Sequence, residues 1–335
     1  MRMDVHRPIV NRPFPDGVSC LGRLPIARRV PLCPTSILLI AISAIHAAPQ
    51  DCAPCHKAQT AAFDQAGMTA ALSPAKDSSV LRKHPLLTKT LDQYRYEIRA
   101  AEYTVTDGKE TLRIPLAWAF GKGTTGQTYL FEREGRWYES RVSYYAPLDG
   151  LDLTIGFQNT KPANLLEAAG RLTSPKEAAQ CFSCHMTQKV AGVQCERCHG
   201  DFGAHPNMKK LGKLSTAQMS DFCGECHRTW EQIAANGPRG ILNVRFQPYR
   251  LASSKCYDAN DRRISCTTCH DPHRTVETKP AFYDAKCRAC HVKGCKVAKK
   301  DCTTCHMPQL DLPGSHRTFA DHWIRVVKKD APYPD

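Results

Sequence analysis

The sequence predicts a mainly α-helical and irregular fold of short helices and loops, into which an antiparallel β domain is inserted near the N-terminal end. Two observations predict this. The first is a dense series of C-x-x-C-H motifs, which leaves little room for an ordinary core of side chains. The second is the stretch 91–160, which contains neither Cys nor His and is rich in β-branched and aromatic residues.

Seven C-x-x-C-H motifs run through the 335 residues. Their cysteines are Cys52, Cys55, Cys181, Cys184, Cys195, Cys198, Cys223, Cys226, Cys266, Cys269, Cys287, Cys290, Cys302 and Cys305. Their histidines are His56, His185, His199, His227, His270, His291 and His306. In this signature two thiols bond to the vinyl groups of one porphyrin, and the adjacent His binds the iron from the proximal side. The sequence therefore predicts seven covalently attached c-type haems.

Paired cysteines have three other common uses in proteins. A zinc ribbon needs four ligands, which paired C-x-x-C motifs can supply, but it gives no reason for a His after every second Cys. A redox dithiol would occur once, near a βαβ pattern. A disulfide scaffold does not require the histidines either.

The motifs and the β-rich stretch divide the chain into four predicted segments. These are a signal peptide (1–48), a first haem segment (49–85), a haem-free antiparallel β insert (86–160) and a six-haem domain (161–335). For the haem-bearing segments we expect a multihaem cytochrome fold, in which stacked haems form the core.

The predicted signal peptide has an apolar run over 37–45, preceded by Arg28 and Arg29 and followed by Ala47 and Ala48. That run is too short to span a membrane, and no other apolar stretch approaches spanning length. Because c-type haem is attached outside the cytoplasm, we expect a periplasmic or extracellular protein without a membrane-spanning segment.

Local patterns predict the elements in order. The Ala-rich stretch 58–71 predicts a helix that Ser73-Pro74 breaks, and 91–160 predicts four to six strands in hairpins, separated by glycine-containing turns. Helices are expected over 164–169 and from Ser174-Pro175 onward. Six motifs then follow in little over 120 residues, and a short helix is expected over 319–327.

The second axial ligand decides whether a haem iron only passes electrons or also binds a substrate. Outside the motifs and the leader five histidines remain, fewer than seven haems need. The candidate distal ligands are Met68, His84, His205, His273, His316 and His322. At least two haems therefore need Met or another ligand, or stay open. The alternatives are a Met that packs in a core and histidines that are exposed or bonded to propionates.

Charge and spare cysteines give two further expectations. The net charge is +14, of which the leader contributes +4, and haem propionates would pair with much of the remaining Lys and Arg excess. Clustered basic patches with interleaved aromatics are missing, which argues against nucleic acid and leaves acidic redox proteins as the expected partners. Cys256 and Cys295 lie outside the motifs and are a possible disulfide, with two free thiols as the alternative.

Three segments carry a family resemblance. They are 192–200 followed by His205, the run Cys266-Thr267-Thr268-Cys269-His270-Asp271-Pro272-His273, and the run Cys302-Thr303-Thr304-Cys305-His306-Met307-Pro308. They resemble the superfamily of multihaem cytochromes that includes hydroxylamine oxidoreductase, its tetrahaem electron acceptor and the octahaem reductases. The resemblance implies that His205 and His273 are distal ligands. Two features depart from it: Met68 stands where a His is common, and the C-x-x-C-K motif of pentahaem nitrite reductases does not occur.

The sequence favours an electron-transfer protein over an enzyme, namely a row of haems that relays electrons between redox partners. The alternative is a reductase or oxidase of a small nitrogen or sulfur compound at a five-coordinate haem, since the ligand shortfall permits one. A haem-bearing structural subunit is a third class, and resemblance alone does not decide among them.

Overall fold

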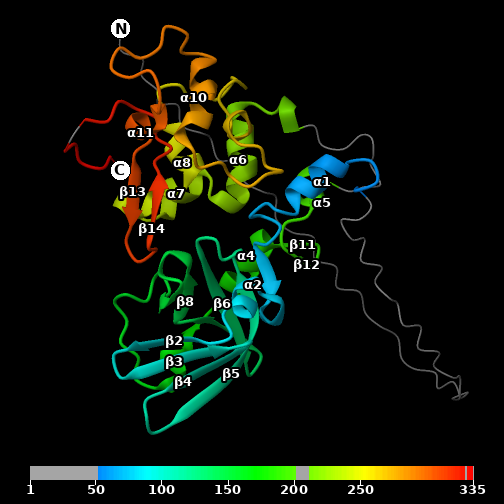
Figure 1. Cartoon of the computed structure of the whole chain (residues 1–335), viewed down its shortest axis with the longest axis vertical. Helices are drawn as coiled ribbons and strands as arrows, with labels where there is room; N and C mark the ends of the chain where they lie inside the picture. Colours follow the sequence, from blue (N-terminus) through cyan, green and yellow to red (C-terminus); the bar gives the residue numbers. More distant parts are fainter. Residues whose placement is uncertain (1–51, 201–210, 329, 335) are drawn as a thin grey trace, which may run out of the picture. The chain divides into compact units, whose positions relative to one another are not determined.

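An antiparallel sheet of ten strands is the largest element of the computed structural model, which describes residues 52–200, 211–328 and 330–334. The strands are β1 Leu72–Pro74, β2 Leu87–Leu91, β3 Tyr94–Arg99, β4 Glu102–Thr106, β5 Thr111–Phe120, β6 Gly126–Arg133, β7 Arg136–Ser140, β8 Val142–Tyr145, β9 Gly150–Leu153 and β10 Gly170–Leu172. The main path runs β10-β7-β6-β5-β4-β3-β2, while β1 pairs with β5 and β8 pairs with β6 and β9. Figure 1 shows β2 to β5 side by side.

Alternation along the strands explains why this stretch forms a sheet. In β3 the side chains of Tyr94, Tyr96 and Ile98 are buried and those between them are more exposed. In β4 Tyr103 and Val105 are buried in the same way. Side chains two apart on a strand lie on the same face, so both strands present one apolar face to the core.

The predicted fold class is wrong, because the protein is not mainly α-helical. The strand-rich stretch does form antiparallel strands, but the sheet is larger than four to six strands. It recruits short segments that carry no alternating pattern of their own. Leu72 of β1 pairs with Phe120, and Leu172 of β10 pairs with Tyr138. Pairing with distant strands decided the conformation of these segments.

The helices are short. They are α1 Lys57–Phe63, α2 Ser79–Lys83, α3 Leu165–Ala169, α4 Pro175–His185, α5 Cys195–His199, α6 Thr216–His227, α7 Trp230–Asn236, α8 Gln247–Ala252, α9 Cys266–Cys269, α10 Pro280–Arg288 and α11 Cys302–His306. Two small hairpins accompany them, β11 Met186–Thr187 with β12 Val190–Ala191 and β13 Gln309–Leu312 with β14 Arg317–Ala320. Among the residues described, none of the helices has the length and apolarity that a membrane crossing needs.

The helix starts follow their capping residues. Helix α4 begins at Pro175, as Ser174-Pro175 predicts, and Ser174 and Glu177 form a capping box there, while Asn164 caps α3. Two local predictions are wrong. Helix α1 ends at Phe63 instead of continuing to residue 71, and the tail forms strand β14 instead of a helix over 319–327.

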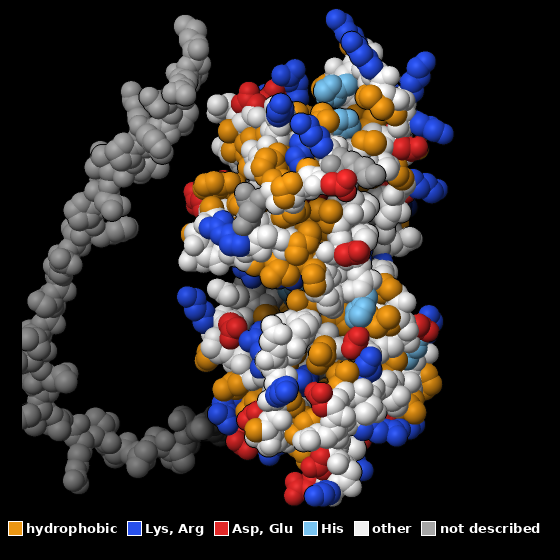
Figure 2. Space-filling model, turned by 90° about the vertical axis from the view of Figure 1, so that its left-hand side faces the viewer, with side chains coloured by type: hydrophobic (Ala, Val, Ile, Leu, Met, Phe, Trp, Pro, Cys, Tyr) orange, Lys and Arg blue, Asp and Glu red, His pale blue; other side chains and the backbone are white. Residues whose placement is uncertain are grey.

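The apolar core lies in the sheet. The largest cluster of buried apolar side chains is confined to residues 75–169. From residue 175 on, the buried apolar side chains among those described are Ala178, Val193, Met219, Ile233, Val244, Leu251 and Leu312. In the same region large apolar side chains are exposed, namely Trp230, Leu242, Val276, Phe282, Val292, Val297 and Val326. Figure 2 shows apolar side chains gathered in broad areas of one face. The helical region therefore has little side-chain core of its own.

The core of the sheet yields a stability prediction. Tyr129 is fully buried, and its hydroxyl has no hydrogen-bond partner among the described residues. Replacing it with Phe removes an unsatisfied polar group, so we expect Tyr129→Phe to raise the free energy of unfolding by about 1 kcal/mol at pH 7. Burial also raises the pKa of Tyr129 well above its usual value. Above pH ~10 only the unfolded state ionises, so the advantage of Phe should grow by about 1.4 kcal/mol per pH unit.

Denaturant unfolding at pH 7 and pH 11 measures both effects. Tyr145→Phe is the matched control, because the Tyr145 hydroxyl donates a hydrogen bond to the carbonyl oxygen of Leu153 at 2.8 Å. That variant should lose about 1 kcal/mol at pH 7. A Tyr129→Phe protein that is less stable than the original at both pH values would contradict the prediction.

Candidate haem-binding sites

Each motif is folded as a helical turn or lies at the end of one. Helices α5, α9 and α11 consist almost entirely of a motif, and α4, α6 and α10 lead into one. The first motif directly precedes α1, and the amide of His56 donates to the carbonyl oxygen of Cys52 at 2.8 Å. Such a turn brings both thiols and the following His toward one side. The motif cysteines are half-buried or exposed, so a large group can reach them.

The motifs also contact one another. The thiols of Cys52 and Cys195 interact, which joins the first motif to the third. A guanidinium nitrogen of Arg197 lies 3.3 Å from the Glu225 carboxylate, which joins the third to the fourth. The Cys184 thiol donates to the carbonyl oxygen of Glu225 at 3.6 Å, so the second motif meets the fourth as well.

The remaining contacts run through the helices that carry the later motifs. Helix α6 packs against α9, α9 against α10, and α10 against α11. The Asp284 carboxylate on α10 accepts a hydrogen bond from the Cys302 amide at 2.8 Å, which holds the start of α11. All seven motifs are therefore connected in one contiguous series. The first, third, fourth, fifth, sixth and seventh contact one another in that order, and the second contacts the fourth.

Two motif histidines face a second histidine at the spacing that haem ligation needs. The ring centroids of His199 and His273 are 6.0 Å apart, and those of His270 and His322 are 6.2 Å apart. An imidazole nitrogen lies about 2 Å from a bound first-row metal ion, so the centroids of two imidazoles on opposite sides of one ion are roughly 6 Å apart. Both pairs therefore fit a bis-histidine iron.

The Nδ1 atoms of several of these histidines are already engaged, which leaves Nε2 for iron. The hydrogen-bonded pairs are His185 with the carbonyl oxygen of Ala71 (2.8 Å), His306 with that of Arg325 (2.9 Å), His322 with that of Ala320 (3.0 Å) and His273 with Asp271 Oδ1 (3.1 Å). A hydrogen bond at one ring nitrogen fixes the tautomer and the orientation of a ligating His.

Burial favours the neutral imidazole that binds iron. It lowers the pKa of His270, and it lowers the pKa of His322 to about 4. Burial, helped by His273 and His56, also lowers the pKa of His199. Since a protonated imidazole has no lone pair for a metal, these shifts keep the three side chains ready to ligate.

The other candidate ligands lie elsewhere. His84 Nε2 is 3.3 Å from an Asp149 oxygen, and His316 Nε2 is 3.1 Å from an Asp152 oxygen, so both imidazoles contact carboxylates of the sheet region. Met68 lies beyond the end of α1.

Three sequence-based predictions are not tested by these positions. His205 and the signal peptide lie outside the described residues. The structure holds Cys256 and Cys295 as thiols, Cys256 half-buried and Cys295 exposed. Their pairing stays a prediction.

Sequence reasoning missed the residues that hold His322. Arg250 and Asp321 form a buried ion pair between residues 71 positions apart. Neither residue lies in a sequence motif. Their role becomes visible only in the structure, where both charged side chains are buried.

Comparisons with known proteins agree with haem attachment. A family model described as cytochrome c3 matches residues 187–292, a range that contains four complete motifs. The multihaem cytochrome MtrA of Shewanella baltica (strain OS185) is 26% identical over 173 residues, which cover 42% of this chain and 49% of that protein. The chain thus spans about half the length of this curated relative. No solved structure matches.

Four findings concern the region of the motifs: the turn geometry, the two histidine pairs, the small side-chain core of the helical region and the similarity to known cytochromes. They fit covalently bound haem at the positions that the sequence predicts. The likeness to the hydroxylamine oxidoreductase superfamily stays a prediction. The part of the chain that carries these motifs is similar to multihaem c-type cytochromes.

Proposed function

We propose that this chain is an exported electron-transfer cytochrome that carries seven c-type haems, one on each motif, and relays electrons between redox partners in the periplasm or at the cell surface. When bound, haem supplies one-electron redox chemistry at its iron, and the protein sets spacing and ligation. The single observation that carries the proposal is the contiguous series of motifs. Each motif touches at least one other through a thiol, an ion pair or a packed helix.

The order of contacts supports a relay rather than separate sites. The fourth, fifth, sixth and seventh motifs lie on helices that pack in succession, α6 on α9, α9 on α10 and α10 on α11. The first and third motifs join this series at the fourth through Arg197 and Glu225. Groups attached to neighbouring helical turns would lie close together, as electron transfer without a diffusing carrier requires.

A basic surface near the sixth motif supports acidic redox partners. The stretch 286–300 contains six basic residues and no acidic one, and all six are exposed: Lys286, Arg288, Lys293, Lys296, Lys299 and Lys300. Such a surface raises the rate of encounter with an acidic partner and loses this effect as salt rises.

The proposed domain organisation follows the four predicted segments, with the sheet region as a haem-free module. We propose that 1–48 is a signal peptide, 49–85 a first haem segment, 86–160 the β insert and 161–335 the six-haem domain. The sheet includes β10 at Gly170–Leu172, so its last strand extends into the segment assigned to the haems.

Mass spectrometry and protein-film voltammetry of the mature chain, produced in a host that attaches c-type haem, test the proposal. We expect the added mass of seven haems, and a reversible voltammetric wave that nitrite and hydroxylamine leave unchanged. A catalytic current with either compound would replace the relay by the reductase or oxidase. A product without bound haem would overturn the proposal.

A further inference from the structure

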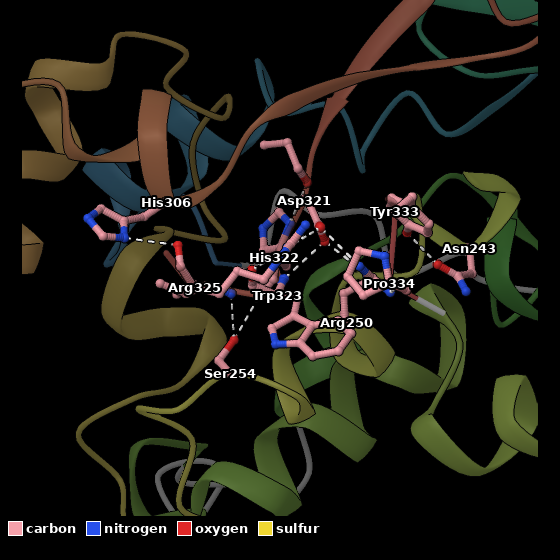
Figure 3. Close-up of polar contacts among 12 residues, drawn as sticks. Asn243, Arg250, Ser254, His306, Asp321, His322, Trp323, Arg325, Tyr333 and Pro334 are labelled. Carbon is pink, nitrogen blue, oxygen red and sulfur yellow. Dashed lines mark hydrogen bonds and ion pairs between the residues drawn. The ribbon is translucent and has the colours of Figure 1, made fainter. Parts of the chain in front are cut away.

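A buried ion-pair network fixes the C-terminal tail to helix α8. Arg250 on α8 is 1% exposed and Asp321 is fully buried. Their side chains form a two-pronged pair, Nε to Oδ1 and Nη2 to Oδ2, each at 2.9 Å. Arg325 adds a third bond, from Nη1 to Asp321 Oδ2 at 2.6 Å. One carboxylate therefore receives two guanidinium groups (Figure 3).

Further contacts tie the backbone of the tail to the same place. The Trp323 amide donates to Asp321 Oδ1 at 3.0 Å, and the Arg250 guanidinium lies 5.0 Å from the centre of the Trp323 ring. Ser254, just after α8, donates its hydroxyl hydrogen to the carbonyl oxygen of His322 at 3.0 Å and accepts from the Ile324 amide at 2.8 Å. The residue between these contacts, His322, is therefore held on both sides.

The network touches two histidines that serve different motifs. His322 directly follows Asp321, and its ring lies 6.2 Å from that of His270, the proximal histidine of the fifth motif. The carbonyl oxygen of Arg325 accepts a hydrogen bond from Nδ1 of His306, the histidine of the seventh motif, at 2.9 Å. Figure 3 shows His322 beside Asp321 near the centre of these contacts and His306 at their left-hand end.

We propose that His322 is the distal iron ligand opposite His270, and that Arg250, Asp321 and Arg325 are positioning residues that set both this ligand and the orientation of His306. The inference rests on the attachment of haem under the proposed function and assigns a ligand pair that the sequence left open. It makes one buried charge cluster responsible for the coordination of two haems.

The chemistry of the cluster suits positioning better than stabilisation. A buried ion pair gives little net stability, because desolvating the charges offsets most of their attraction. It does fix geometry, since a planar guanidinium binds a carboxylate in one orientation. An axial ligand has to be held to within about 0.5 Å, and a tail without regular structure has few other means to achieve this.

The first test removes the ligand. In ferric, haem-loaded His322→Ala, electron paramagnetic resonance should show one haem per chain changed from low spin to high spin, and added imidazole should restore the low-spin signal. Glu97→Gln, which removes an ion pair with Arg99 and touches no candidate ligand, is the control. Unchanged spin in His322→Ala, or the same change in Glu97→Gln, would overturn the assignment.

The second test keeps the ligand and loosens its support. Asp321→Asn preserves the side-chain shape but removes the charge, and Arg325→Gln is the milder change because Arg325 is 18% exposed. In the ferrous protein both should let carbon monoxide bind to about one additional haem per chain, with a smaller bound fraction for Arg325→Gln, because a poorly held His is displaced. Glu97→Gln, which removes an exposed ion pair with Arg99, should bind no more carbon monoxide than the original protein.

A purely structural role predicts a different result. Then Asp321→Asn and Arg325→Gln would lower the unfolding midpoint without any gain in carbon monoxide binding, and the positioning role would be refuted. The haem mass of the original protein distinguishes a failure of the proposed function from a failure of this inference alone. A chain without haem overturns the proposed function and this inference together, whereas a fully loaded chain whose variants keep their spin state and their carbon monoxide binding overturns the inference alone.

Discussion

Replacing Asp321 with alanine is expected to lower the free energy of unfolding by about 3–5 kcal/mol, among the largest effects of any single substitution in this chain. The reason is the charge that is left behind. Arg250 is 1% exposed, and its guanidinium would lose the carboxylate that accepts two of its hydrogen bonds. Denaturant unfolding of the haem-loaded protein at pH 7, followed by circular dichroism, measures the loss.

Two further variants separate the charge from the side-chain volume. In the double variant Arg250→Met with Asp321→Leu no buried charge is left, and Arg325 is exposed enough to reach water, so most of the lost stability should return. Glu97→Ala removes an exposed ion pair, 3.3 Å from Arg99, and should cost less than about 1 kcal/mol. If Asp321→Ala costs no more than Glu97→Ala, the buried pair is not what holds the tail.

The pair of Arg250 and Asp321 shows why part of the site could not be predicted from the sequence. The motifs could be predicted because their chemistry is local: two thiols and an imidazole stand within five residues. The pairing of His273 with His199 and of His322 with His270 joins residues 74 and 52 positions apart in the sequence. Spacing indicated that His273 lies too near its own motif to serve it, but spacing alone does not indicate which haem it faces.

The fold was predictable to a similar degree. Alternating side chains predict strands such as β3 and β4, because each buries one face. The three-residue strands β1 and β10 carry no periodic signal and form only because β5 and β7 offer open edges. They enlarge the sheet from the eight strands β2 to β9 to ten, and with so large a sheet the mainly α-helical class is wrong.

Tertiary contacts also overrode a local preference in the first segment. The Ala-rich stretch 58–71 favours a helix throughout, yet α1 ends at Phe63. Beyond it the backbone makes a few local turn bonds and also bonds to distant segments. The carbonyl oxygen of Met68 accepts from the Val193 amide at 3.0 Å, and that of Ala71 accepts from the Gly121 amide at 2.9 Å. Helix propensity is worth too little per residue to compete with such contacts.

That junction gives the second large prediction. Gly192 has φ +81°, and a Cβ at this position would collide with the carbonyl oxygen of Thr69. Gly192→Ala should therefore combine backbone strain with a backbone clash and lower the free energy of unfolding by about 3 kcal/mol or more. Hydrogen exchange should report where the damage lies, because the Val193 amide would lose its protection as the two segments separate.

Gly135→Ala isolates the clash from the strain. Gly135 has φ +70° and nothing within 4 Å of the added carbon, so its substitution should cost only about 1 kcal/mol and leave the exchange of Val193 unchanged. Equal losses in the two variants would show that the approach of Gly192 to Thr69 carries no special stability. A larger loss in Gly192→Ala would instead make this contact the point that holds the segment of the first motif against that of the third, where the proposed relay needs the two to stay close.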